Sequence, residues 1–219
     1  MAQMIGHGVY ALSEAARYAG LPVGTVRSWF KPRSDHRGQG PLFRSDYGPI
    51  EDDYAISFLN LIEAYVARFF RKEGVKAPIL RRAHEVLQTE LDTVHPFAHS
   101  ALRTDGKRII RQKGDAELVD VISRQHFFGQ MKLSRIAYSP TSRLAQSWAI
   151  SDGVVIDPTL SFGKPVVERT GVTTFVLANQ YKANRGDAAL VARLFSIKDA
   201  DVLNAVKFEA GLSRLPKAA

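Results

Sequence analysis

The chain has 219 residues, of which 45% are hydrophobic and 24% charged, a composition that can bury one large core or two small ones. It contains no cysteine, which excludes disulfide scaffolds, cysteine-based zinc and iron–sulfur sites, and thiol nucleophiles. No apolar run is long enough for a transmembrane helix and no secretory signal is visible. The sequence therefore predicts a cytoplasmic protein without a membrane partner.

The charge balance is basic. The chain has 30 Lys and Arg against 22 Asp and Glu, a formal net charge of +8. The surplus is spread along the chain, and the ratio of basic to acidic residues is highest in the first fifty residues. Because a basic balance is one sign of a nucleic-acid partner, this segment is where DNA binding is expected.

The N-terminal half is predicted to be mostly helical. Apolar periodicity predicts helices over residues 12–19 and 23–30, separated by Gly20-Leu21-Pro22, and then a loop or wing over residues 33–49. Two longer helices follow over residues 57–72 and 78–91. Thr104-Asp105-Gly106-Lys107, between short apolar stretches, predicts a hairpin within residues 99–112.

Residues 118–167 are predicted to be mostly β, and the chain then returns to helix. Short strands are expected at 118–122, 136–138, 144–150, 154–156 and 166–167, and helices at 174–183, 187–195 and 199–210. The predicted fold class is mainly α with a β-rich connecting region: an N-terminal winged helix-turn-helix and a small C-terminal trihelical module preceded by short strands. The predicted domains are 1–114, 115–152 and 153–219, the middle one being a connector that can also form a dimer.

The segment Tyr10–Phe30 has the form of a helix-turn-helix. Ala15 and Ala16 are small enough for two helices to approach, and Trp29 anchors the second helix to the core. In this motif the second helix enters the major groove of DNA. Its outward polar residues are therefore predicted to contact DNA, with Arg27 pairing with a guanine and basic residues of the helix end and the loop meeting phosphates. The predicted set is Thr25, Arg27, Ser28, Lys31, Arg33, Arg37 and Arg44.

Roles other than DNA binding, either structural or simply solvent-exposed, remain open for these residues. A helical hairpin that serves only the core would have the same spacing, and Arg37 and Arg44 are equally compatible with a solvated loop. Arg81 and Arg82 are expected on the solvated face of a later helix.

Several segments resemble known families. Ser13–Phe30 is similar to the helix-turn-helix of MerR-like regulators, and the helices at Ile56-Ser-Phe-Leu and Ile79-Leu-Arg-Arg resemble a variant of that domain. Val155–Val167 with Thr170–Thr174 resembles a domain of unknown function that is typical of VapB-like antitoxins in type II toxin–antitoxin pairs. Lys198 departs from that pattern, where a threonine caps the last helix, and Ser196 is predicted to cap the helix instead.

The resemblance implies an antitoxin that neutralises a PIN-type ribonuclease toxin and represses its own operon. It would bind double-stranded operator DNA as a homodimer or as a higher assembly with the toxin. Spacing does not select the residues that contact the toxin, and the candidates are Arg185, Arg193, Arg214 and Lys217. The trihelical end is also compatible with a second helix-turn-helix, in which Arg185 and Arg193 would lie near DNA.

No enzyme motif is present in the sequence. There is no Gly-x-Ser-x-Gly, no phosphate-cradling loop and no dinucleotide fingerprint. His95 and His99 are four residues apart, but Pro96 lies between them and no third metal ligand has suitable spacing. We therefore expect no catalytic residue, metal or cofactor.

Two rival functions remain. The first is a stand-alone MerR-like regulator whose C-terminal module senses a ligand or partner, which an apolar pocket lined by aromatic residues would favour. The second is a pure protein-interaction inhibitor whose helix-turn-helix is only structural.

Overall fold

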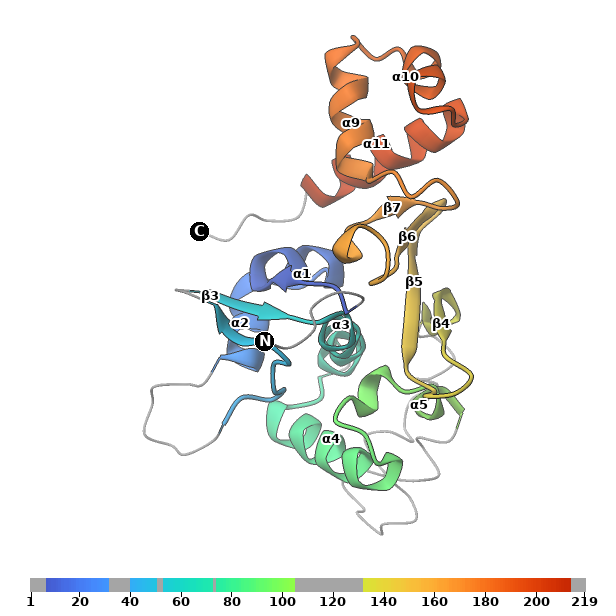
Figure 1. Cartoon of the computed structure of the whole chain (residues 1–219). Coiled ribbons are helices and arrows are strands. Elements are labelled where there is room, and N and C mark those ends of the chain that lie inside the picture. The colour runs from blue at the N-terminus through green and yellow to red at the C-terminus, as the bar shows by residue number, and fades with distance from the viewer. Residues whose placement is uncertain (1–6, 32–39, 51–52, 73, 105–131, 214–219) are drawn as a thin grey trace. The chain divides into compact units, whose positions relative to one another are not determined.

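The chain forms two compact units (Figure 1). The computed structural model describes residues 7–31, 40–50, 53–72, 74–104 and 132–213. The first unit, here the inner unit, is Tyr10–Gln146, and the second, the outer unit, combines Met1–Val9 with Ser147–Ala219. The backbone N–H of Val9 donates to the carbonyl of Phe162 at 3.3 Å, so Val9 is bonded to the C-terminal part of the chain.

The inner unit is mainly helical with a small sheet. Its described elements in chain order are β1 (Tyr10–Ala11), α1 (Leu12–Ala19), α2 (Val23–Phe30), β2 (Gly48–Ile50), β3 (Asp53–Ile56), α3 (Phe58–Lys72), α4 (Ala77–Leu91), η1 (Pro96–Ala98), α5 (Ala101–Thr104), η2 (Lys132–Arg135) and β4 (Ile136–Tyr138). The sheet has the order β1-β3-β2, and both pairings are antiparallel.

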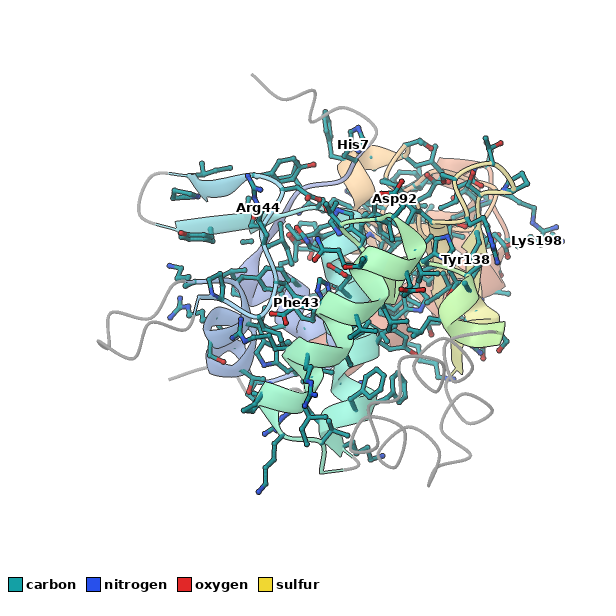
Figure 2. All side chains as sticks on the ribbon, turned by 90° about the horizontal axis from the view of Figure 1, so that it is seen from below. His7, Phe43, Arg44, Asp92, Tyr138 and Lys198 are labelled. Atoms are coloured by element: carbon teal, nitrogen blue, oxygen red, sulfur yellow. The ribbon has the colours of Figure 1, made fainter. Side chains whose placement is uncertain are left out.

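The core of the inner unit is built around α3. Apolar side chains recur at helical spacing along this helix, and its buried residues include Leu61, Ile62 and Val66. The centroid of the Phe43 ring, labelled in Figure 2, lies 5.9 Å from that of Trp29 and 5.4 Å from that of Phe30, both on α2, and 5.9 Å from that of Phe97. A single aromatic residue from the loop after α2 therefore joins that helix to the centre of the unit.

The outer unit is a helical group preceded by short strands. The chain passes between the units within β5 (Ala145–Ser151), and then forms β6 (Val154–Ile156), η3 (Ser161–Gly163), β7 (Val166–Val167), α9 (Thr174–Ala183), α10 (Ala188–Phe195) and α11 (Asp199–Ser213). The second sheet has the order β4-β5-β6-β7. The three helices of the outer unit follow the strands (Figure 1). The apolar core of this unit consists of Val167, Leu177, Val191, Ala192, Val202 and Ala205.

The predicted mainly helical fold with short strands is confirmed, and several local predictions are corrected. Residues 101–104 form α5 rather than a hairpin strand, because Ala101 and Leu102 are buried and the Ala101 N–H donates to Nδ1 of His99 at 3.2 Å. The sequence also missed β1 and β3, each of which is short. The predicted strand at 118–122 and the boundary at residue 114 lie outside the described residues.

The capping of the last helix also differs from the prediction. Ser196 has a φ of 55° and closes α10, so it does not cap α11. The N–H of Lys198 donates instead to Oδ2 of Asp201 at 3.1 Å, which makes an acidic side chain in the first turn of α11 the capping group.

Along the described ranges, no helix combines the length and the apolar character needed to cross a bilayer.

Candidate nucleic-acid interface

The turn between α1 and α2 is fixed by a glycine and an arginine. Gly20 closes α1 in the left-handed region, with a φ of 64°, and its N–H faces the carbonyls of Ala16 and Arg17. Arg68 of α3 donates from Nη1 to the carbonyl of Ala19 at 3.0 Å and lies directly over the turn. A Cβ added to Gly20 would overlap that guanidinium. The left-handed backbone conformation therefore favours glycine here, and a side chain at this position would also displace the Arg68 guanidinium.

The inner face of α2 holds the helix in place. Val26, Trp29 and Phe30 are buried, as expected for residues that repeat at helical spacing. The N–H of Phe43 donates to the carbonyl of Trp29 at 2.9 Å, and its ring lies 5.9 Å from the Trp29 ring, edge to face. Because this face of α2 is packed against the core, only the opposite face of the helix is accessible to a partner.

The predicted DNA-contacting residues of α2 are not equivalent. The side chain of Arg27 is exposed and makes no hydrogen bond or ion pair with the described residues. Thr25 and Ser28 are half-buried, and the Ser28 hydroxyl donates to the carbonyl of Thr25 at 2.7 Å. The ammonium of Lys31 lies 5.3 Å from the ring centroid of Tyr54 on β3. Arg27 therefore has the most accessible charged side chain of the predicted set on this helix.

The predicted basic loop is only partly visible. Arg33 and Arg37 lie outside the described residues. The Arg44 side chain is exposed, and its backbone is anchored because its carbonyl accepts a hydrogen bond from Nδ2 of Asn60 at 3.1 Å. The loop after α2 therefore re-enters the fold at a defined position, with one of the predicted phosphate contacts on its surface.

Beneath this loop lies a buried charge network that the sequence analysis missed. Glu63 of α3 is 1% exposed, and its carboxylate accepts hydrogen bonds from Nε2 of His84 at 2.8 Å and from Nδ1 of His95 at 3.1 Å. On its other side, Nε2 of His95 lies 3.1 Å from Oδ1 of Asp46. Asp46 also accepts a short hydrogen bond from the Ser57 hydroxyl. The network joins the loop after α2 to α3, α4 and the segment before η1.

The charges of this network reinforce one another. Burial alone would raise the pKa of Glu63, but the hydrogen bonds and positive charges of His84 and His95 outweigh burial and lower it. Burial would likewise lower the pKa of His95, but hydrogen bonds to Asp46 and Glu63 raise it to about 10. Glu63 is therefore an anion and His95 a cation at neutral pH. A glutamate among the mostly apolar buried positions of α3 was the sequence signal for this arrangement.

The two histidines examined for metal binding have separate roles. His95 belongs to the buried network, whereas Nδ1 of His99 accepts the N–H of Ala101. Burial and the nearby charge of Arg143 lower the pKa of His99. Within the described parts of the chain, no group of three or more His, Asp or Glu side chains is arranged to hold a metal ion.

The candidate toxin-contacting residues lie on the outer unit, and only two of them are described. Arg185 and Arg193 are both exposed, Arg193 on α10 and Arg185 in the turn before that helix. Arg214 and Lys217 lie outside the described residues. A hollow of about 410 Å³ beside the turn from α10 to α11 is lined by charged and polar residues, including Glu168, Arg169 and Asp201. It lacks the aromatic lining that the ligand-sensing alternative called for.

The chain is similar to a curated protein and to a solved structure. No protein-family model matches the chain. The chain is 25% identical over 190 residues to a Mycobacterium tuberculosis protein named "Putative antitoxin VapB45", a match that covers 75% of this chain and 78% of that protein. It resembles the crystal structure of Rv2018 from Mycobacterium tuberculosis with a TM-score of 0.73 and 24% identity, over 90% of this chain and 96% of that one. The second likeness shows a shared fold, and the first connects the chain to a protein named as an antitoxin.

Proposed function

We propose that this protein is an antitoxin that binds and neutralises a PIN-type ribonuclease toxin and represses its own operon by binding operator DNA. The observation that carries the antitoxin assignment is the likeness, over three quarters of the chain, to the protein named as antitoxin VapB45. The toxin type and the repressor role rest on the sequence resemblance described above. No enzymatic activity is proposed for the chain itself.

In this proposal α2 is the helix that enters the major groove. Its inner face is held by Trp29 and Phe43, so that the outer face, with Arg27, is free to meet base edges. A guanidinium can pair with two acceptors of guanine, which makes Arg27 the residue that reads sequence. Lys31 and the loop residues Arg33, Arg37 and Arg44 supply contacts to phosphates, which position the protein without specifying a sequence.

The operator should then have the symmetry of the protein. A homodimer presents two copies of α2, and each copy reads one half-site. The operator is therefore expected to be an inverted repeat with half-sites about 10 base pairs apart, or a multiple of that distance. Because much of the affinity comes from phosphate contacts, binding should weaken steeply as salt is raised.

The first experiment is a gel shift of the full chain on DNA from upstream of its own gene, at about 150 mM salt with excess nonspecific competitor. Arg27→Ala should lose roughly 1–3 kcal/mol of binding free energy and relax the preference at one base pair. Arg17→Ala is the matched control, because Arg17 is an exposed arginine on α1 rather than on α2. If the Arg27→Ala variant binds every DNA sequence as tightly as the parent protein does, the assignment of Arg27 is wrong.

The toxin half of the proposal has its own test. The product of the neighbouring gene should co-purify with this chain, and its ribonuclease activity should fall as the chain is added. Arg185→Ala and Arg193→Ala, compared separately, test whether either exposed arginine of the outer unit takes part. A neighbouring product that neither binds nor is inhibited would rule out this pairing while leaving operator binding to be judged on its own.

A further inference from the structure

A small hollow lies beside α2 in the inner unit, and its charged lining is entirely basic. It has a volume of about 290 Å³, and Thr25 and Ser28 of α2 are among the residues that line it. Arg71, near the end of α3, and Arg81, on α4, also line it. Among the described residues that line the hollow, none carries a carboxylate.

Both guanidinium groups are held in place by one hydrogen bond to the backbone. Nη1 of Arg71 donates to the carbonyl of Val75 at 2.7 Å, and Nη1 of Arg81 donates to the carbonyl of Pro41 at 2.6 Å. Neither side chain makes a further hydrogen bond or an ion pair with the described residues. Since a guanidinium has five N–H donors in a fixed plane, each arginine is oriented and still has most of its donors available.

The hydroxyl groups of these α2 residues add to this arrangement. The Ser28 hydroxyl uses its proton on the carbonyl of Thr25, whereas the Thr25 hydroxyl makes no hydrogen bond within the described residues. The hollow thus combines two oriented cations with a free hydroxyl donor. Compact oxyanions with several acceptor oxygens, above all phosphates, are the ligands that such a set of donors recognises.

We propose that this hollow binds one phosphate of the DNA backbone, with Arg71 and Arg81 as its principal ligands and Thr25 as a further donor. The proposal rests on the proposed operator binding by α2, because a strand that lies along that helix is what brings a phosphate to the hollow. It also divides the outer face of α2 into two functions. Arg27 reads a base, whereas Thr25 and Ser28 face the sugar–phosphate backbone and do not contribute to sequence preference.

The decisive experiment measures the salt dependence of binding by the full chain to its operator and to unrelated DNA. The double variant Arg71→Gln/Arg81→Gln should bind both DNAs about 10- to 100-fold more weakly. The slope of log affinity against log salt should become shallower by about 0.9, the value for one lost phosphate contact. Arg82→Gln is the matched control, because Arg82 is exposed on the same helix and does not line the hollow.

A charge-retaining variant guards against a simple loss of structure. Arg71→Lys/Arg81→Lys keeps both cations but loses the planar donors, so it should retain most of the salt slope while binding more weakly than the parent. If the parent binds its operator and the glutamine variant keeps the full slope, the phosphate site is wrong and the role of Arg27 is untouched. If the parent binds no DNA, with or without the neighbouring gene's product, the proposed operator binding fails.

Titration with inorganic phosphate distinguishes the two sources of the ligand. Amide resonances of Thr25 and Ser28 should shift only slightly with millimolar phosphate and strongly with operator DNA. Strong shifts with phosphate alone, in a protein that binds no DNA, would identify the occupant as a free phosphate anion and overturn the backbone assignment.

Discussion

The α1–α2 pair of the inner unit and the α10–α11 pair of the outer unit have the same local geometry and different surfaces. In each pair an eight-residue helix ends at a left-handed residue, Gly20 or Ser196, and the second helix begins three residues later. The next N–H along the chain bonds back to the same relative carbonyl, Leu21 to Ala16 at 2.9 Å and Ile197 to Ala192 at 3.0 Å. Six residues after the left-handed residue, each pair buries a valine completely.

The outward positions of the second helices differ in chemistry. Where α2 has Arg27, the same position in α11 is Leu203, with an exposed fraction of 48%. The first turn of α11 contains Asp199 and Asp201, whereas the first turn of α2 has no acidic residue. Carboxylates at that end would repel phosphates. Backbone geometry alone therefore does not identify a DNA-binding helix, and the outward side chains decide which pair is a candidate.

The interiors of the two units also differ. The unit that contains α1 and α2 includes the Glu63 network of buried charges, whereas the unit that contains α10 and α11 has an apolar core. Glu63→Ala is the substitution expected to have the largest effect, and the effect should be confined to the inner unit. Removing one partner of a buried ion pair leaves the other uncompensated, so we expect the inner unit to lose about 3–5 kcal/mol of stability.

Urea unfolding followed by tryptophan fluorescence would measure this effect, because Trp29 lies in the inner unit and Trp148 in the outer unit. A Trp148→Phe background reports on the inner unit and a Trp29→Phe background on the outer one. Glu85→Ala, at an exposed site on α4, is the control and should change stability by less than about 0.5 kcal/mol. An equal loss at both tryptophans would show that the units do not unfold separately.

The same network predicts a pH dependence for the inner unit. The pKa of His95 is raised from 6.5 to about 10 on folding, so its contribution is complete below pH 6.5 and is lost as pH rises towards 10. Stability of the inner unit should therefore fall between pH 7 and 9, by on the order of 2–3 kcal/mol. His95→Gln should flatten this dependence in the Trp148→Phe background. A parent protein whose inner unit is equally stable at pH 7 and 9 would contradict the assignment of charge to His95.

Exchanging the two left-handed residues tests the turns directly. Gly20→Ser should destabilise the inner pair by at least about 1–2 kcal/mol, because serine is strained at this φ and its Cβ would displace Arg68. Ser196→Gly should stabilise the outer pair by up to about 1 kcal/mol, because it removes the same strain. Hydrogen exchange at the amides of Val26 and Val202 would report each change where it occurs. The two substitutions should therefore change stability in opposite directions. If both change it in the same direction, the two turns are not equivalent.

The smallest predicted effect concerns Gly24, which occupies the position of Ala200 in the outer pair. Gly24 is exposed in a helix, and a Cβ added there meets no atom within 4 Å. Neither the backbone conformation nor the packing of the described residues requires glycine at this site. Gly24→Ala should stabilise the inner unit by about 0.5–1 kcal/mol in urea unfolding, and a loss of stability would contradict this account.

The sequence predicted the longer helices well, although not the short α5, because most of the longer helices have a clear signal at their ends. Gly20 and Pro22 separate α1 from α2, and the helices of the outer unit are divided at Asn184-Arg185-Gly186 and Ser196-Ile197. The small strands were harder to predict. β1 contains only two residues and pairs with β3 across more than forty positions, so no local pattern marks it.

The site was predicted only in part for a similar reason. Arg27 was found because it lies on the outer face of a short helix whose inner face is apolar. Arg81 was assigned to the solvated face of α4 and Arg71 of α3 was not singled out, since nothing in the sequence places either residue next to Thr25. The buried network likewise depends on contacts between residues 21 and 32 positions apart, which no spacing rule describes.

The hydrogen bond from Val9 to Phe162 has a consequence for the order in which the protein is made. Every residue of the inner unit has been synthesised once Gln146 has been added, whereas the outer unit still lacks all of its helices at that point. Since domains fold as units during synthesis, the unit proposed to bind DNA can fold while its partner is still incomplete. The hydrogen bond of Val9 can then form only after the segment around Phe162 has left the ribosome.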